Sequence, residues 1–229
     1  MDGCKDGYYP VEIASIIFHS SDDWQGEVQK LYQALDTNWH INIRSRCGLH
    51  VHVAPAKNMK FTLDQTKGVA KAVHVFEAAL RDYMPRERKD PRYATPNHRC
   101  APESVQQLYN YIESSTWAEI FAGIDQCQDY RKIHEEMGGN KDCSMFFGSR
   151  HGTIKFRRPP SAVNARHLIH WVALGVGFIS AGSHQYAEDW RLHPTHATIR
   201  DLKVFIEWGL LPLGASFANA LRTDEWRKH

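Results

Sequence analysis

The segment Cys47–Val53, Cys-Gly-Leu-His-Val-His-Val, alternates apolar residues with histidines. Side chains along a β-strand point alternately to its two faces. The leucine and the two valines are therefore predicted to face a hydrophobic core, and His50 and His52 to share the opposite face. Two adjacent imidazoles are suited to binding or proton transfer, although two ordinary, half-exposed histidines would give the same pattern.

The charge balance of the chain argues against two classes of partner. Its 229 residues include 28 Lys and Arg and 26 Asp and Glu, which gives a net charge of +2. Such an even balance predicts neither a nucleic-acid partner nor a membrane surface. Hydrophobic residues make up 42% of the chain, enough for a packed core, and no repeat or linker divides it. We expect one domain over residues 1–229.

The cysteines and the first residues indicate a cytoplasmic location. The cysteines are Cys4, Cys47, Cys100, Cys127 and Cys143. Their number is odd and no pair has CxxC spacing, so we expect reduced thiols rather than disulfides or a thiolate zinc site. Residues 1–7 are polar and acidic, unlike a signal peptide. The longest apolar run, Leu168–Ala181, is too short for a bilayer and predicts a core helix.

Four further segments have the composition or alternation of strands. They are Tyr9–Phe18, Trp39–Arg44, Ser144–Ser149 and Thr153–Arg157. Trp39–Arg44 is expected to pair antiparallel with the histidine strand, and a tight turn at residues 150–152 to join the last two. If the alternating strands share one antiparallel sheet, its polar face carries Glu12, Asn42, Arg44, His50, His52, Lys155 and Arg157.

Other segments show helical periodicity or helix-capping residues. They are a helix after Ser20–Asp22 that ends near Leu35, Thr62–Met84, Pro102–Ser114, one or two short helices in Trp117–Gly139, Asn164–Ser180, Thr195–Trp208, and Ala215–Arg227. Thr62 and Gln65 have the spacing of a capping box. The predicted fold class is α+β, an antiparallel sheet flanked on one face by helices.

The histidine strand and three other segments together resemble a known family. CGLHVHV, VEIAS upstream, MPRERKDPRYATP after the long helix, and GTIKFR before the last core helix occur in the same order as in the amidoligase family found widely in fungi, over roughly residues 8–182. That family is related to glutamine synthetase and other carboxylate–amine ligases. The resemblance implies a curved antiparallel sheet of the glutamine synthetase type and ATP-dependent joining of a carboxylate to an amine, through an acyl phosphate held by Mg²⁺. It also implies that Glu12 and His50 are metal-site residues and that Arg157 holds phosphate or carboxylate.

Two differences from the family pattern predict altered or lost dependence on ATP and Mg²⁺. The family strand usually reads Thr-[Ile/Val]-Glu-Phe-Arg, and here its glutamate is Lys155. Family members also begin with a Glu-x-Glu type strand, which this chain does not show. Mg²⁺ is a hard cation that prefers carboxylate and phosphate oxygens. Glu12 is the one strand carboxylate expected beside Lys155, Arg157 and Arg44, so we predict no metal ligands.

A cationic pocket with imidazoles is therefore expected, suited to a small anionic or carboxylate-bearing molecule. The predicted catalytic residues are His50, His52, Lys155 and Glu12. The imidazoles would exchange protons, with Glu12 orienting one of them, and Lys155 would neutralise developing charge or form an imine. The predicted substrate-binding residues are Arg157, Arg44, Asn42, Arg86 and Arg88, the last two as a lid from the loop Pro85–Pro96.

Several alternatives stay open from the sequence alone. Lys155 is also explained as a solvated strand residue, Glu12 as an ion-pair partner of Arg44, and the arginine-rich loop as exposed surface. A zinc site would need a third ligand beside the two histidines. The protein could act without ATP as a cyclase, isomerase or condensing enzyme of specialised metabolism, or could only bind a ligand or partner. A homo-oligomer in which another chain supplies the missing strand is a further possibility.

Overall fold

The structure, a computed structural model, describes residues 9–44, 47–56, 58–90, 92, 94–110, 116–148, 152–193 and 195–221. In chain order its elements are α1 (Trp24–Asn38), β1 (Val51–Val53), α2 (Leu63–Tyr83), the 3-10 helix η1 (Arg86–Arg88), α3 (Asn97–Cys100), α4 (Glu103–Asn110), α5 (Thr116–Asp125), α6 (Tyr130–Glu136), β2 (Met145–Phe146), β3 (Ile154–Phe156), α7 (Ala165–Ser183), η2 (Tyr186–Trp190), α8 (Ile199–Leu210), η3 (Leu211–Leu213) and α9 (Ala215–Ala220). The fold is α+β with an antiparallel sheet, as predicted.

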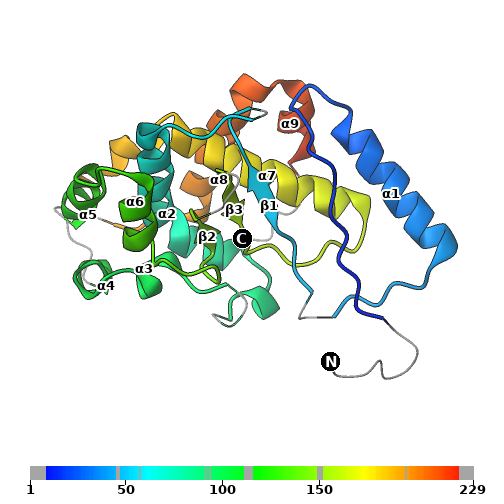
Figure 1. Cartoon of the computed structure of the whole chain (residues 1–229), viewed down its shortest axis with the longest axis horizontal. Coiled ribbons are helices and arrows are strands. Elements are labelled where there is room, and N and C mark those ends of the chain that lie inside the picture. Colours follow the sequence, from blue (N-terminus) through cyan, green and yellow to red (C-terminus); the bar gives the residue numbers. More distant parts are fainter. Residues whose placement is uncertain are drawn as a thin grey trace.

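Helix α2 runs through the middle of the molecule. It begins at the predicted capping box, in which the Thr62 hydroxyl accepts a hydrogen bond from the Gln65 main-chain N–H at 3.2 Å and the Gln65 side chain accepts one from the Thr62 N–H at 2.9 Å. Helices α2, α7 and α8 lie between α1 and α9 at one end and α3–α6 at the other (Figure 1). Because neighbours surround α2, most of its residues are buried, including polar ones.

The centre of the core is a cluster of three phenylalanines from α2, α7 and α8. The rings of Phe76 and Phe205 stack with centroids 4.4 Å apart, and Phe178 meets Phe205 edge-on at 5.5 Å. Offset stacks and edge-to-face pairs are the arrangements that aromatic rings favour. Helices α7 and α8 can approach closely because Gly209 has no β-carbon. A β-carbon at this position would collide with the carbonyl oxygen of Gly177.

The sheet has the order β1-β3-β2, with both pairs antiparallel. Val51 faces Phe156 across the β1–β3 ladder, and both are buried. Gly175 of α7 packs against them, since a β-carbon there would lie 2.9 Å from the Phe156 ring. Helix α7 therefore covers the apolar face of the sheet.

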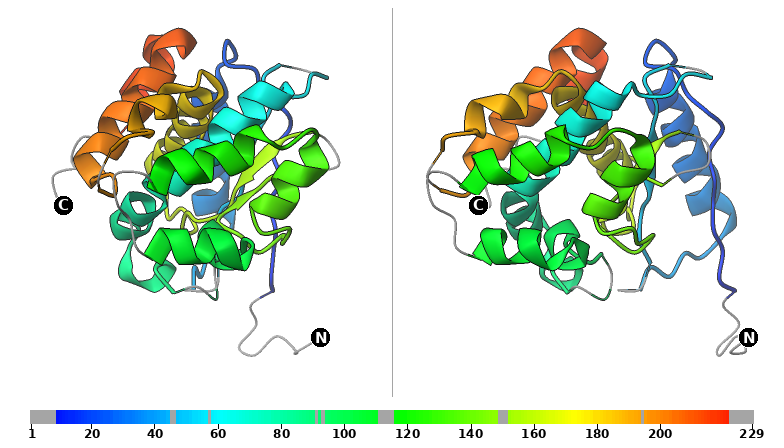
Figure 2. Two further views of the ribbon diagram at one scale, coloured as in Figure 1. Left: turned by 90° about the vertical axis from the view of Figure 1, so that its left-hand side faces the viewer. Right: turned by 60° about the vertical axis from the view of Figure 1, so that its left-hand side comes forward.

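Two predicted strands are wrong. Tyr9–Phe18 and Trp39–Arg44 form no strand in the described chain, and β1 pairs with β3 rather than with Trp39–Arg44. β-Branched residues favour extended backbone, but a strand also needs a hydrogen-bonded neighbour. Residues 9–19 (dark blue) run as an irregular stretch past β1 and α1 on the outside of the molecule (Figures 1 and 2). Ile16 and Ile17 of this stretch are 74% and 80% exposed.

Every segment predicted to be helical contains a helix, although α8 begins at Ile199 rather than Thr195 and α9 ends at Ala220. Trp117–Gly139 contains two helices, α5 and α6, and Gly138 and Gly139 after them have positive φ angles of 99° and 59°. Residues 111–115 of the predicted Pro102–Ser114 helix, residues 222–227 of the last helix, and residues 149–151 of the hairpin lie outside the described residues. No helix in the described ranges has the length and apolar character needed to cross a membrane.

Candidate functional site

The alternation of the histidine strand places His52 and Lys155 on the same face of the sheet. They are directly opposed in the β1–β3 ladder, whereas Val51 and Phe156 turn to the core. The His52 ring lies 3.1 Å from the Thr153 hydroxyl through Nδ1. The predicted separation of apolar and polar faces is confirmed for this strand. We call His50, His52 and Lys155 the histidine face.

Lys155 is half buried in the middle strand of the sheet. Its ammonium lies over the ring of Phe146, its partner residue in the β2–β3 ladder, at 5.3 Å from the ring centroid. Burial, followed by the positive charge of Arg157, lowers the pKa of Lys155. Among the described residues it has no ion pair, so its charge is available to a ligand.

His50 directly precedes β1 and lies near several of the predicted site residues. The His50 side chain is exposed at the surface, but partial desolvation by its neighbours lowers its pKa to about 4, and the positive charges of Lys155 and Arg157 act in the same direction. The negative charge of Glu12 opposes them. The structure thus brings these three charged groups close enough to His50 to act on its charge. The imidazole of His50 is therefore neutral at pH 7, and one of its ring nitrogens can accept a hydrogen bond.

Arg157 lies at the end of β3 and already has protein partners. Its Nη1 donates to the carbonyl oxygen of Lys141 at 3.0 Å and lies 3.0 Å from a carboxylate oxygen of Asp142. Its Nε is buried and has no hydrogen-bond partner among the described residues. The guanidinium is therefore held in place and partly neutralised, with one N–H left unsatisfied.

Arg88 does not lie where a lid would place it. It is 3% exposed, and its guanidinium donates to the main-chain carbonyls of Arg158 at 3.1 Å and Arg157 at 3.2 Å. These hydrogen bonds fix the backbone of the two residues that follow β3. The lid prediction is wrong for Arg88 because its donors are used by the backbone, while Arg86 is exposed on the surface.

Three other predicted residues lie on segments outside the sheet. Asn42 and Arg44 are exposed in the stretch that follows α1, so the prediction that a strand carries them onto the polar face is wrong. Glu12 is exposed on the stretch that precedes α1 and reaches the site through its charge on His50.

A buried network around Glu77 was not predicted. Its carboxylate is 2% exposed and accepts hydrogen bonds from the main-chain N–H of Asn97 at 2.8 Å, the ring of His98 at 3.2 Å, the hydroxyl of Ser144 at 2.6 Å and the guanidinium of Arg158 at 3.2 Å. Burial by itself raises the pKa of Glu77, but the His98 hydrogen bond and the Arg158 charge outweigh it and lower that pKa to about 2.

The sequence does contain one indication of this network. Glu77 falls at helical spacing between Val73 and Leu80, on the apolar stripe of α2. A carboxylate on such a stripe has to find buried donors. Its partners lie 20 to 81 residues further along the chain, so they could not be identified by spacing.

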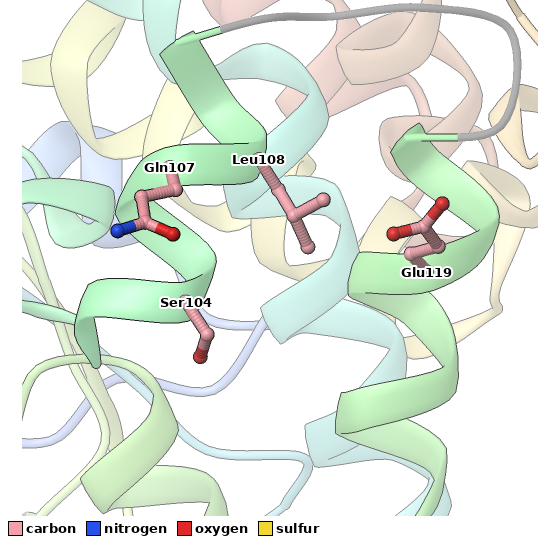
Figure 3. A pocket seen from close by; sticks show the side chains of 4 residues that line it. All are labelled: Ser104, Gln107, Leu108 and Glu119. Atoms are coloured by element: carbon pink, nitrogen blue, oxygen red, sulfur yellow. The ribbon is translucent and has the colours of Figure 1, made fainter.

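A separate shallow groove lies between α4 and α5, on elements that carry none of the predicted site residues. Ser104, Gln107 and Leu108 of α4 line one side and Glu119 of α5 the other (Figure 3). One carboxylate and two uncharged polar groups give this groove little capacity for a chemical reaction. The histidine face is the better candidate.

The donor atoms around the histidine face do not fit a Mg²⁺ site. Mg²⁺ prefers near-octahedral oxygen ligands, usually carboxylates and phosphates. Here Glu12 is the carboxylate that acts on His50, and Lys155 and Arg157 add positive charge to the same place. Within the described ranges, no three His, Cys, Asp or Glu side chains are grouped so as to hold a metal ion.

Comparison with family models decides the relationship that the histidine strand suggests. The model described as "putative amidoligase enzyme" matches residues 3–179. The chain belongs to this amidoligase family. The match includes the histidine face, Arg157 and the Glu77 network. Comparisons with curated proteins and with solved structures gave no match, so the similarity to the glutamine synthetase fold stays a prediction.

Proposed function

We propose that this amidoligase-family protein acts on a small carboxylate-bearing molecule, such as an amino-acid-derived metabolite, in a reaction at a carbon–nitrogen bond. One observation carries the proposal: Lys155 and Arg157 lie close enough to His50 for their charges to lower its pKa. The two cations can bind an anion, and the neutral imidazole beside them can accept a proton.

In this proposal the two cations bind the carboxylate. The planar guanidinium of Arg157 matches the two oxygens of a carboxylate. Its buried Nε–H has no described partner, which favours a bound group at this point. The ammonium of Lys155 stabilises negative charge that develops on the substrate during the reaction. Arg157 shares its charge with Asp142, so Lys155 is the more available cation.

The imidazole of His50 then accepts a hydrogen bond from the substrate nitrogen. A base with a pKa of about 4 is neutral at pH 7 and takes up a proton only as positive charge develops on an attacking amine. Glu12 favours that protonated form by its charge. His52, next to Thr153, lies on the same face and can bind a polar group of the substrate.

We propose further that the family's ATP and Mg²⁺ dependence is altered or lost here. The argument is the donor set, because an ammonium stands where the family strand has a carboxylate. We assign no residue to ATP or Mg²⁺, and no step is routed through them.

A second candidate is an ATP-independent cyclase, isomerase or condensing enzyme. Burial and Arg157 lower the pKa of Lys155, which increases the fraction of neutral amine at a given pH. A neutral lysine amine can attack a substrate carbonyl and form an imine with loss of water. Borohydride reduction with a carbonyl substrate would then attach mass to Lys155 in the wild type and none in the Lys155→Arg variant.

Ligand binding tests the proposed site before any substrate is known. A panel of amino acids and dicarboxylates is titrated into the full chain by calorimetry, and a binder is compared in Arg157→Gln, Lys155→Met and Arg131→Gln. Arg131 is a matched control because it is an exposed arginine on α6. We expect the first two variants to weaken binding at least about tenfold, or 1.4 kcal/mol. Equal affinity in all four proteins would contradict the proposal.

The cofactor part is tested with the same binder and a set of amines. Product formation is followed by mass spectrometry with ATP and Mg²⁺, without ATP, and with EDTA. Turnover that continues in EDTA supports the altered dependence. Turnover that requires both ATP and Mg²⁺ would show that the inherited ligase reaction is intact.

A further inference from the structure

Two thiols outside the proposed site, those of Cys100 and Cys143, lie next to each other. Cys100 is the last residue of α3 and is half buried. Cys143 lies in the turn before β2 and is 1% exposed. The Cys143 thiol lies close enough to the Cys100 thiol to interact with it, and both are free. Cys127, by contrast, donates to the Gly123 carbonyl of its own segment at 3.6 Å.

The backbone on both sides of this thiol pair is firmly held. Thr95 bridges to Cys143, with hydrogen bonds from the Ser144 N–H to the Thr95 carbonyl at 2.8 Å and from the Thr95 N–H to the Asp142 carbonyl at 3.0 Å. The side-chain oxygen of Asn97, at the start of α3, accepts a hydrogen bond from the Met145 main-chain N–H at 2.9 Å and lies 2.8 Å from the Ser144 hydroxyl oxygen. The segment leading into α3 and the segment that carries Cys143 are therefore held together by the fold.

The two thiols differ in how easily an oxidant reaches them. Burial, followed by the contact with Cys100, raises the pKa of Cys143, which keeps it as a thiol. Oxidation begins at thiolates that solvent can reach, and a neighbouring protected thiol then resolves the product. Cys100 is the more exposed member and fits the first role, and Cys143 fits the second.

We propose that Cys100 and Cys143 form a peroxide-sensitive pair that closes to a disulfide. The Cys100 thiolate attacks hydrogen peroxide, so that an S–O bond forms, the O–O bond breaks, and the released hydroxide takes a proton to leave as water. The Cys143 sulfur then attacks the Cys100 sulfenic sulfur, so that the S–S bond forms and the S–O bond breaks. The leaving hydroxide takes the Cys143 proton as a second water. Two thiols lose two electrons and two protons in total, and one peroxide becomes two waters.

The disulfide would join α3 to the segment that holds Arg157. Asp142, the ion-pair partner of Arg157, precedes Cys143 directly. The carbonyl of Ser144, which follows Cys143, accepts a hydrogen bond from the Arg157 main-chain N–H at 3.0 Å. Oxidation at the pair is thus expected to restrict the segment behind this arginine. The cross-link itself does not depend on the proposed function.

Peptide mapping tests the pair directly. The reduced full chain is treated with a slight excess of hydrogen peroxide, remaining thiols are alkylated, and digested peptides are examined by mass spectrometry. We expect a loss of two hydrogens and a linked peptide pair containing Cys100 and Cys143, which dithiothreitol reverses. Oxidation of Cys100 to the sulfinic acid without the linked pair, or linkage of other cysteines, would overturn the proposal.

Variants distinguish the two roles. Cys143→Ser is expected to leave a Cys100 sulfenic acid that dimedone traps, while Cys100→Ser should give neither the linkage nor a trapped Cys143. Cys127→Ser is the matched control, a buried thiol away from the pair, and should form the linkage as the wild type does. Dimedone labelling of Cys143 rather than Cys100 would contradict the assigned order. The wild-type mapping answers the main question even if a serine at the buried position prevents folding.

Discussion

Gly48 lies against the buried guanidinium of Arg88, and a β-carbon on this glycine would come within 3.1 Å of Nη2. The same guanidinium donates to the carbonyls of Arg157 and Arg158. The glycine of the histidine segment therefore leaves room for the arginine that fixes the neighbouring strand. His50 follows Gly48 by two residues, so this contact lies next to the histidine face.

Gly48→Ala should destabilise the fold by about 1 kcal/mol, because the added methyl group would come within 3.1 Å of a buried, hydrogen-bonded guanidinium and push it slightly away from its carbonyl partners. The free energy of unfolding in urea is measured for Gly48→Ala, for Arg88→Ala and for the double variant. If the two residues are in contact, the loss in the double variant is smaller than the sum of the single losses. Strictly additive losses would show that the glycine does not act through Arg88.

Glu77→Gln should cost about 3–5 kcal/mol, since it leaves Arg158 as a buried charge without its partner. Urea denaturation measures the loss. Glu135→Gln is the control, because Glu135 forms exposed ion pairs with Arg131 and Lys132 and its loss should be hardly measurable. Similar stabilities of the two variants would contradict the central place of Glu77 in the buried network.

The lowered pKa of Glu77 predicts a loss of stability in acid. Its folded pKa is about 2, below the ordinary value of 4.5, so ionised Glu77 stabilises the folded state. That contribution is complete above pH 4.5 and is lost as the pH falls from 4.5 towards 2. The free energy of unfolding of the wild type should therefore fall more steeply than that of Glu77→Gln below pH 4.5. Parallel curves would show that Glu77 is not ionised in the fold.

The pKa of His50 is expected near 4 in an NMR titration of the folded protein. Lys155→Met should raise it towards its ordinary value of 6.5, because one of the two nearby cations is removed. Lys141→Met is the control, an exposed lysine close to Arg157 in the fold. An unchanged His50 pKa in Lys155→Met, or an equal rise in both variants, would contradict the geometry on which the proposed function depends.

Gly209→Ala should destabilise the fold by at least about 2 kcal/mol, because its methyl group meets the Gly177 carbonyl where α7 and α8 cross. Gly123→Ala is a matched control, since this helical glycine has nothing within 4 Å of an added β-carbon. It should be stabilising by about 0.5–1 kcal/mol. Thermal unfolding of both variants checks the opposite signs.

Local patterns in the sequence were sufficient for much of the fold. The capping box at Thr62 and Gln65 located the start of α2, and the period-two alternation of the histidine segment assigned its faces. Both depend on residues close together in the chain. The same kind of pattern failed for Tyr9–Phe18, because alternation reports the preferred backbone but not whether another strand is there to pair with it.

The candidate site could be predicted in part for the same reason. His50, His52, Lys155 and Arg157 lie on or directly beside paired strands, so alternation placed them correctly relative to one another. The role of Arg88 depends on carbonyl groups 69 and 70 residues away, and that of Glu77 on donors from three other segments. Such contacts leave no periodic trace, and an arginine on a charged loop resembles a surface residue until the packing is known.

The exposed stretch before α1 has a practical consequence for handling the protein. Residues 11–17, Val-Glu-Ile-Ala-Ser-Ile-Ile, are rich in β-branched side chains, contain no proline and carry one charge. Segments of this composition with unpaired backbone groups can form β-strand pairs between molecules and nucleate fibrils. Concentrated solutions of the protein should therefore aggregate through this segment, and Ile16→Lys should reduce that aggregation.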